Sequence, residues 1–311
     1  MRRCWEPWPP PPGGRPSVNP RVAEYRTLLA AQAETPGDLA DRDEMFFARS
    51  FVPRPGLPVG ISRIVLLSKL REVRVQVGFT RIESASPDVH GEFDLSVRSS
   101  PLSTEAIDWL PAHEVRGEGF FLQLDEDRVR EWEDRPEVDA RAQTLLRGYE
   151  RWAAGQSRTP PPFPGIRYYL LHALSHGLIS AVSLECGYAA SAIRERSYCA
   201  PRTSSLPMAG ILLSTGTSGS EGTLGGLVEQ GRRVGSHLQA AWDRALLCSN
   251  DPICAMHDPA RHAARYLEGA ACHGCLFVAE PSCERNNTQL DRALLVPIIG
   301  QPDTAFFPKR P

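Results

Sequence analysis

Five of the eight cysteines in this 311-residue chain lie between Cys248 and Cys283. Two of them form the turn Cys272-His-Gly-Cys275, in which two thiolates can reach one metal ion and the glycine eases the bend. Cys248 and Cys254 supply a second pair. Because zinc prefers four such ligands at tetrahedral corners, the spacing predicts one Zn²⁺ held by Cys248, Cys254, Cys272 and Cys275, with Cys283 as a reserve ligand.

Four cysteine ligands leave no open coordination position, so the predicted zinc is structural rather than catalytic. The alternative is a group of free buried cysteines with a redox pair. The charged N-terminus is not followed by an apolar stretch, so the chain shows no secretion signal, and clustered cysteines then favour a metal over disulfides. No apolar run approaches the roughly 18 residues that cross a bilayer, and we therefore expect a cytoplasmic protein without membrane contact.

His172 and His176 stand one helical turn apart, a spacing that can chelate a metal. With Glu185 they form the candidate centre of a metal-dependent hydrolase or nuclease. Ala173, however, occupies the position at which a zinc-protease motif has glutamate, and Glu185 lies too far along the same helix to join without a bend. The favoured interpretation is that both histidines hydrogen-bond within a helix interface. No other nucleophile motif stands out, so the sequence predicts no enzyme active site.

Phosphate contacts are the second candidate chemistry. The glycine-rich segment from Gly216 to Gly226 is similar to an anion-binding loop, but it lacks the lysine of a Walker A nucleotide site. A formal net charge of −2 excludes a globally basic nucleic-acid binder. Local contacts remain open, and the candidate phosphate ligands are Arg194, Arg196, Arg232 and Arg233. We expect Arg194 and Arg196 to lie in a charged turn that directly follows a long helix.

Both helices and strands must position these side chains. Apolar alternation and short apolar runs predict strands over residues 64–67, 73–77, 118–124 and 211–213. Helical periodicity predicts helices over 21–35, 125–132, 143–153, 167–190 and 224–247, with glycines kinking the last one. A short helix or strand is expected over 286–296. The fold class is therefore α+β, with mixed helices and short strands and a C-terminal cysteine-rich zinc-binding module.

Composition and proline content suggest how the chain is divided. Hydrophobic residues make up 41% and charged residues 23%, which is ordinary for a folded domain. A proline-rich breaker over 158–164 predicts a boundary. We expect a disordered proline-rich tail over 1–20, an N-terminal α+β region over 21–157, a zinc-binding domain over 165–297 and a loose tail over 298–311.

Ordered blocks of the sequence resemble the MrfA-type zinc-binding domain family and, within it, the DrmB family of the DISARM anti-phage defence system. The blocks are Leu171-His-Ala-Leu-Ser-His176, Leu184-Glu-Cys-Gly-Tyr188, Ser220-Glu-Gly-Thr-Leu-Gly-Gly-Leu227, the cysteine segments given above and Leu290-Asp-Arg292, with further blocks upstream over 70–81 and 114–119. The similarity covers roughly residues 60–297.

The resemblance implies a non-catalytic subunit that works beside a DNA helicase, DrmA, in a complex that binds invading DNA. The resemblance also implies that the family's cysteine positions correspond to Cys248, Cys254, Cys272 and Cys275 in this chain, and that Cys283 belongs to the motif. DrmB chains have a larger N-terminal part, so the resemblance further implies a shortened copy.

Overall fold

The part of the chain that the computed structural model describes comprises residues 19–35, 37, 45–76, 78–80, 99–100, 102–103, 109–156, 159–216 and 226–311. The predicted tail over 1–20 and the glycine-rich segment after Gly216 fall largely outside these residues. None of the helices in the described ranges is long and apolar enough to cross a membrane.

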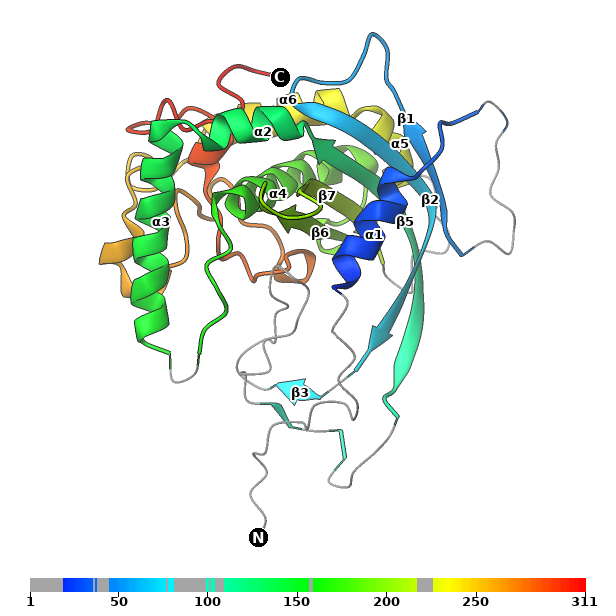
Figure 1. The fold of residues 1–311 in the computed structure, drawn as a ribbon, viewed down its shortest axis with the longest axis horizontal. Coiled ribbons are helices and arrows are strands. Elements are labelled where there is room, and N and C mark those ends of the chain that lie inside the picture. The colour runs from blue at the N-terminus through cyan, green and yellow to red at the C-terminus, as the bar shows by residue number, and fades with distance from the viewer. Residues whose placement is uncertain are drawn as a thin grey trace.

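A five-stranded antiparallel sheet lies at the centre of the structure (Figure 1). Its strands follow the order β1 (Phe47–Phe51), β2 (Ile61–Val75), β5 (Ala112–Leu124), β7 (Met208–Thr215) and β6 (Ile193–Ala200). The run from Ile64 to Leu67 is buried throughout, because the middle of the sheet is covered on both faces. A separate two-stranded ladder pairs β3 (Phe79–Thr80) with β4 (Ser99–Ser100).

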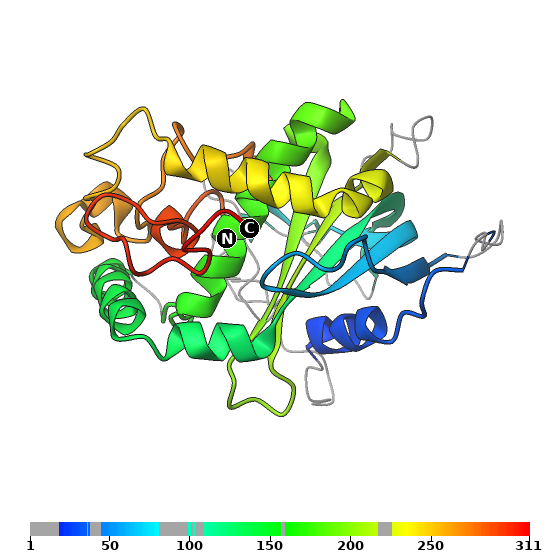
Figure 2. The ribbon, with the colours of Figure 1, turned by 90° about the horizontal axis from the view of Figure 1, so that it is seen from above.

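Helices cover the two faces of this sheet (Figure 2). On one face lies α1 (Pro20–Leu29), whose Tyr25 ring packs against Phe121 and Tyr198. The opposite face carries α4 (Ile166–Cys186), α5 (Gly226–Arg232) and α6 (Val234–Leu246). Beside them lie α2 (Glu126–Glu133) and α3 (Pro136–Ala154). The predicted helix over 224–247 is thus broken into α5 and α6.

Helix α4 is buried around almost its whole circumference, and every residue from Arg167 to Ile179 is buried. Polar side chains on such a helix need partners inside the protein, since an unpaired buried charge is costly. Arg167 finds them in α2, where its guanidinium lies 2.9 Å from carboxylate oxygens of both Glu126 and Glu133. His172 and His176 lie further along the same buried helix.

After α6 the chain has little regular structure. Its helical turns are η2 (Pro259–Arg261), η3 (Ala263–Arg265), η4 (Glu280–Ser282) and η5 (Arg292–Leu294), and η1 (Ala190–Ala192) precedes β6. Of the short helix or strand expected over 286–296, only the single 3₁₀ turn η5 forms. The segment after Gly300, expected to be loose, packs on the core instead. Phe306 and Phe307 are buried, and the Trp132 indole N–H donates to the Thr304 carbonyl at 2.8 Å.

The prediction of a charged turn around Arg194 and Arg196 is also wrong, because these residues belong to strand β6. Alternate residues of β6 face the two sides of the sheet, and its full length pairs with β7. Glu195 points toward α4. Arg196 points to the other face, where its Nε lies 2.6 Å from Glu24 of α1. Glu195 and Arg196 are both paired, so these two charged residues can belong to a largely buried strand.

The predicted mixture of helices and strands with a C-terminal cysteine cluster is confirmed. The predicted boundary near 158–164 separates β5 from β7, and these two strands pair directly in the sheet. The division into a 21–157 region and a 165–297 domain stays a prediction.

Candidate metal centres

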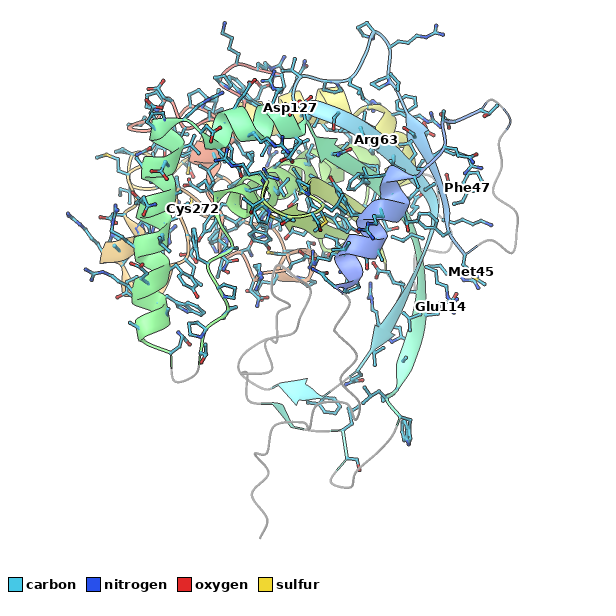
Figure 3. The ribbon with its side chains drawn as sticks, viewed as in Figure 1. Met45, Phe47, Arg63, Glu114, Asp127 and Cys272 are labelled. Carbon is cyan, nitrogen blue, oxygen red and sulfur yellow. The ribbon has the colours of Figure 1, made fainter. Side chains whose placement is uncertain are left out.

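The structure brings four cysteines from two turns of the C-terminal segment together, on the side of the molecule away from β1 (Figure 3). The Sγ atoms of Cys248 and Cys272 lie 3.4 Å apart, those of Cys272 and Cys275 3.7 Å, and those of Cys254 and Cys275 3.9 Å. Four sulfurs at 2.3 Å from one zinc ion would lie about 3.8 Å apart at the corners of a tetrahedron. The four-cysteine cluster therefore fits one structural zinc.

Backbone N–H groups hold these sulfurs in place. The N–H of Gly274 donates to Cys272 Sγ and the N–H of Cys272 donates to Cys275 Sγ, both at 3.3 Å. A Cβ atom on Gly274 would stand 2.7 Å from Ser249 Oγ and 3.4 Å from Cys248 Sγ, so a larger residue would force the Ser249 side chain to move. Such donors favour the thiolate form, which is the form that binds zinc.

A buried guanidinium offsets the charge of the site. Zinc with four thiolates carries a net charge of −2. Arg292 is fully buried beside the cluster, donates to the Ala245 carbonyl at 2.9 Å and pairs with Asp251. Burial lowers the pKa of Arg292, but Asp251 and the neighbouring Cys275 raise it above its ordinary value, so this residue stays cationic.

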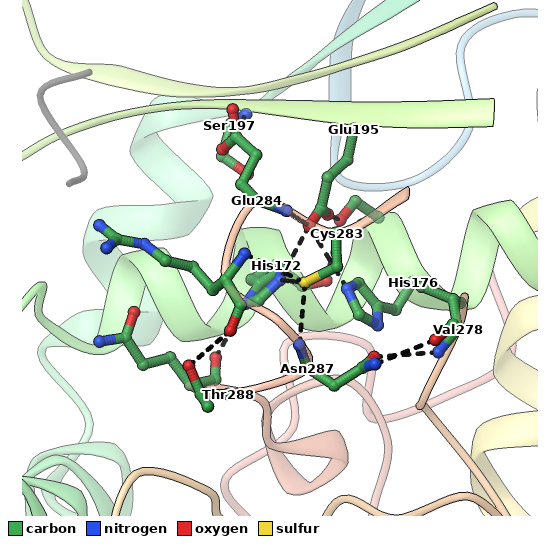
Figure 4. Close-up of polar contacts among 12 residues, drawn as sticks. His172, His176, Glu195, Ser197, Val278, Cys283, Glu284, Asn287 and Thr288 are labelled. Carbon is green, nitrogen blue, oxygen red and sulfur yellow. Dashed lines mark hydrogen bonds and ion pairs between the residues drawn. The ribbon is translucent and has the colours of Figure 1, made fainter. Parts of the chain in front are cut away.

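Cys283, predicted as a reserve ligand of the same zinc, does not lie with the other four cysteines. It lies beside α4 in a second cluster with His172, His176 and Glu195 (Figure 4). His172 Nε2 is 3.1 Å from Cys283 Sγ and 2.9 Å from Glu195 Oε1, and His176 Nε2 is 3.4 Å from the same oxygen. The prediction placed Cys283 by sequence proximity, whereas the fold carries it toward the middle of α4.

The side chains of the two histidines and Glu195 in this cluster are completely buried, and Cys283 is half-buried. Burial lowers the pKa of His176, but the Glu195 carboxylate raises it, and the resulting pKa is about 9. Burial also lowers the pKa of His172, but the Glu195 carboxylate raises it well above its usual value. Burial raises the pKa of Glu195, yet the two histidines bring it well below its ordinary value. The cluster thus couples a buried anion to cationic or metal-bound imidazoles.

Glu185, the acid predicted to complete a centre with His172 and His176, lies elsewhere. It lies nine positions after His176, and nine steps of about 100° put it on the opposite side of the helix. There its carboxylate pairs with Arg233 at 2.9 Å. Sequence reasoning missed Glu195 because it comes from strand β6, whose Arg-Glu-Arg sequence gives no signal of a buried strand.

A serine nucleophile is not assembled beside these histidines either. The Ser175 hydroxyl directs its one proton toward Glu195 and the His172 carbonyl oxygen rather than toward the neighbouring His176 ring. The glycine-rich segment considered as an anion-binding loop lies outside the described residues over 217–225.

Three of the four arginines predicted to contact phosphate are engaged with acidic side chains. Arg196 pairs with Glu24, Arg233 with Glu185, and Arg232 with acids of two different segments. Arg194 has no ion-pair partner among the residues that the structure describes. Burial and the nearby Arg74 lower the pKa of Arg194. A role of these four residues in DNA binding stays a prediction.

Comparison with known proteins agrees with the cysteine chemistry. Residues 174–276 match the MrfA Zn-binding domain. The chain is 38% identical over 292 residues to the DISARM protein DrmB of Bacillus paralicheniformis, and the alignment covers 92% of this chain. The chain spans about half of that curated relative, 49% of its length. A crystal structure of the DUF1998 helicase MrfA bound to DNA aligns with a TM-score of 0.32 at 15% identity, over 70% of this chain and 23% of the helicase. The resemblance found in the sequence is confirmed by the first two matches.

Proposed function

We propose that this chain is a non-catalytic, zinc-stabilised subunit of a DISARM-like anti-phage defence complex in the cytoplasm, where it docks onto a DrmA-like DNA helicase and supports DNA binding. The observation that carries the proposal is the 38% identity to a DISARM protein DrmB across nearly the whole chain. Because that relative is about twice as long, its role in a complex is transferred here as a proposal.

The chemistry of the four-cysteine site supports a scaffold rather than a catalyst. Zinc with four protein thiolates has no free position for water or substrate. The site joins the turn after α6 to the Cys272–Cys275 turn, in a part of the chain whose regular structure is limited to short 3₁₀ turns. In such a segment metal binding contributes directly to the free energy of folding.

The test is co-purification. The untagged chain is co-expressed with a tagged helicase from the same defence locus, and the helicase is recovered on an affinity column. We expect the chain to elute with the helicase in a fixed ratio. Cys275→Ala, which breaks the zinc site, should reduce this recovery, whereas Cys186→Ala, which removes a half-buried thiol outside both clusters, should not.

DNA binding is tested on the same preparations. The complex should bind a labelled DNA more tightly than the helicase alone, with an affinity that falls as salt rises, because phosphate contacts release counterions. A folded wild-type chain that the helicase does not retain would contradict the proposal. Unchanged DNA affinity in a stable complex would contradict the DNA-binding part alone.

A further inference from the structure

We propose that His172, His176, Glu195 and Cys283 form a second metal site, which binds one zinc-like divalent cation and ties helix α4, strand β6 and the C-terminal segment together. The site is separate from the four-cysteine cluster and does not rest on the proposed function.

The donor atoms have the spacing that one small cation needs. One ligand atom from each of the four residues lies within 4.8 Å of all the others. Ligands at the bond lengths of zinc would be about 3.3–3.6 Å apart in a tetrahedron. The 3.4 Å between His176 Nε2 and Glu195 Oε1 matches this range, and the 2.9 and 3.1 Å contacts of His172 need to open by a few tenths of an ångström.

The outer nitrogens of both histidines fix which atom faces the cluster. His172 Nδ1 lies 3.2 Å from the Gln289 carbonyl oxygen, and His176 Nδ1 lies 2.9 Å from the Leu276 carbonyl oxygen. A carbonyl accepts a hydrogen bond and cannot donate one, so each Nδ1 carries a proton. In the neutral imidazole the Nε2 lone pair then points into the cluster. Backbone carbonyls on the outer nitrogen are the usual support of histidines that bind metal.

The His176 ring presents a buried nitrogen to the centre of the cluster. Its Nε2 is completely buried and makes no hydrogen bond, although it lies 3.4 Å from the Glu195 carboxylate. The other groups that face it, a carboxylate and a thiol sulfur, are also acceptors or weak donors. A divalent cation satisfies all of these lone pairs at once.

Backbone N–H groups hold the two anionic ligands, Glu195 and Cys283, in place. The Glu284 N–H donates to Glu195 Oε1 at 3.0 Å. The N–H groups of Arg285 and Asn287 both donate to Cys283 Sγ at 3.2 Å. Asn287 has a φ of +61°, a left-handed conformation that asparagine tolerates well, and its side chain is braced by two hydrogen bonds to the backbone of Val278 (Figure 4). N–H donors on sulfur recur here as they do on Cys272 in the four-cysteine cluster.

Charge and ligand type indicate the class of ion. One thiolate, one carboxylate and two neutral imidazoles neutralise a dication, so the occupied site has no net charge to bury. Sulfur and imidazole ligands favour zinc over magnesium or calcium. Four protein ligands leave no open position, so this metal would have a structural role. The metal-free alternative is an ion pair between Glu195 and protonated histidines.

Metal content of the untagged full chain, produced with zinc and freed of excess metal by gel filtration, tests the proposal. We expect two zinc ions per chain, falling to one in Cys283→Ala and to one in His176→Gln. Cys275→Ala, in the other cluster, should also hold one, and the control Cys186→Ala should hold two. A wild-type chain with a single zinc that Cys275→Ala removes would overturn the proposal. So would two zinc ions that Cys283→Ala leaves in place.

X-ray absorption at the zinc edge of the wild-type chain decides the matter if the variants do not fold. Two occupied sites predict on average about 2.5 sulfur and 1.5 nitrogen or oxygen ligands per zinc, because one site supplies four sulfurs and the other supplies one. A first shell of four sulfurs with no nitrogen would show that the second cluster is the metal-free ion pair.

Discussion

Replacing Arg141 by methionine should destabilise the whole chain, because it leaves a buried carboxylate without its cation. Arg141 of α3 and Asp291 of the C-terminal segment are both buried, and Arg141 Nε lies 2.7 Å from Asp291 Oδ2. The other oxygen of Asp291 accepts the N–H groups of Ala270 and Ala293 at 3.0 and 3.1 Å. The pair therefore fixes the loop that leads into Cys272.

The expected loss follows from this geometry. Removing one partner of a buried ion pair costs about 3–5 kcal/mol, since the remaining charge is uncompensated. Asp291 keeps its two backbone hydrogen bonds, so the lower end of the range applies, and we expect Arg141→Met to reduce the free energy of unfolding by about 3 kcal/mol. The double variant Arg141→Met/Asp291→Asn removes both charges and keeps an oxygen for the two N–H groups. It should be more stable than Arg141→Met alone.

Urea unfolding followed by circular dichroism measures these differences. Arg147→Met is the matched control, because Arg147 lies on the same helix with its side chain exposed, and it should change the free energy of unfolding by less than about 0.5 kcal/mol. A loss below about 1 kcal/mol for Arg141→Met, or a double variant less stable than the single one, would refute the reasoning.

Three further predictions address the sheet, a buried histidine and an unpaired arginine. Gly119→Ala should lower the free energy of unfolding by about 3 kcal/mol or more, because the new Cβ would collide with a β7 carbonyl oxygen where the two strands pair. Gly56 has open space around it, so Gly56→Ala should leave the free energy of unfolding nearly unchanged in the same urea assay. Burial lowers the pKa of His237, so as pH falls below about 6.5 the unfolded chain takes up this proton before the folded chain does, and stability decreases. His237→Gln should therefore reduce the fall of the urea midpoint at acid pH, whereas replacement of an exposed histidine, His113→Gln, should not. Arg194→Ala should weaken DNA binding by the helicase complex and reduce its salt slope by about 1, and an unchanged slope would exclude a phosphate contact there.

The sequence predicts the parts of the site that are local in the chain. Two close cysteine pairs, Cys248 with Cys254 and Cys272 with Cys275, were enough to indicate the zinc cluster, because each pair is joined by a short turn. The helix that carries the two histidines was predicted over 167–190 and runs from Ile166 to Cys186. Apolar residues at three- and four-residue steps indicated this helix, although in the structure nearly all of its sides are buried.

The second cluster could not be predicted, because its four ligands come from three separate segments. Glu195 belongs to a strand whose Arg-Glu-Arg sequence is typical of a solvated turn. In the interior its carboxylate faces His172 and His176, which come from the separate helix α4. The C-terminal phenylalanines posed the same difficulty: Phe306 lies in no periodic segment, and its burial depends on the contact with Trp132.

The most direct test of the account is anomalous scattering from crystals of the chain, measured on both sides of the zinc absorption edge. We predict a zinc peak equidistant from the sulfurs of Cys248, Cys254, Cys272 and Cys275. Crystals of protein purified with zinc that show no peak among these four sulfurs, or that show them joined as disulfides, would contradict it.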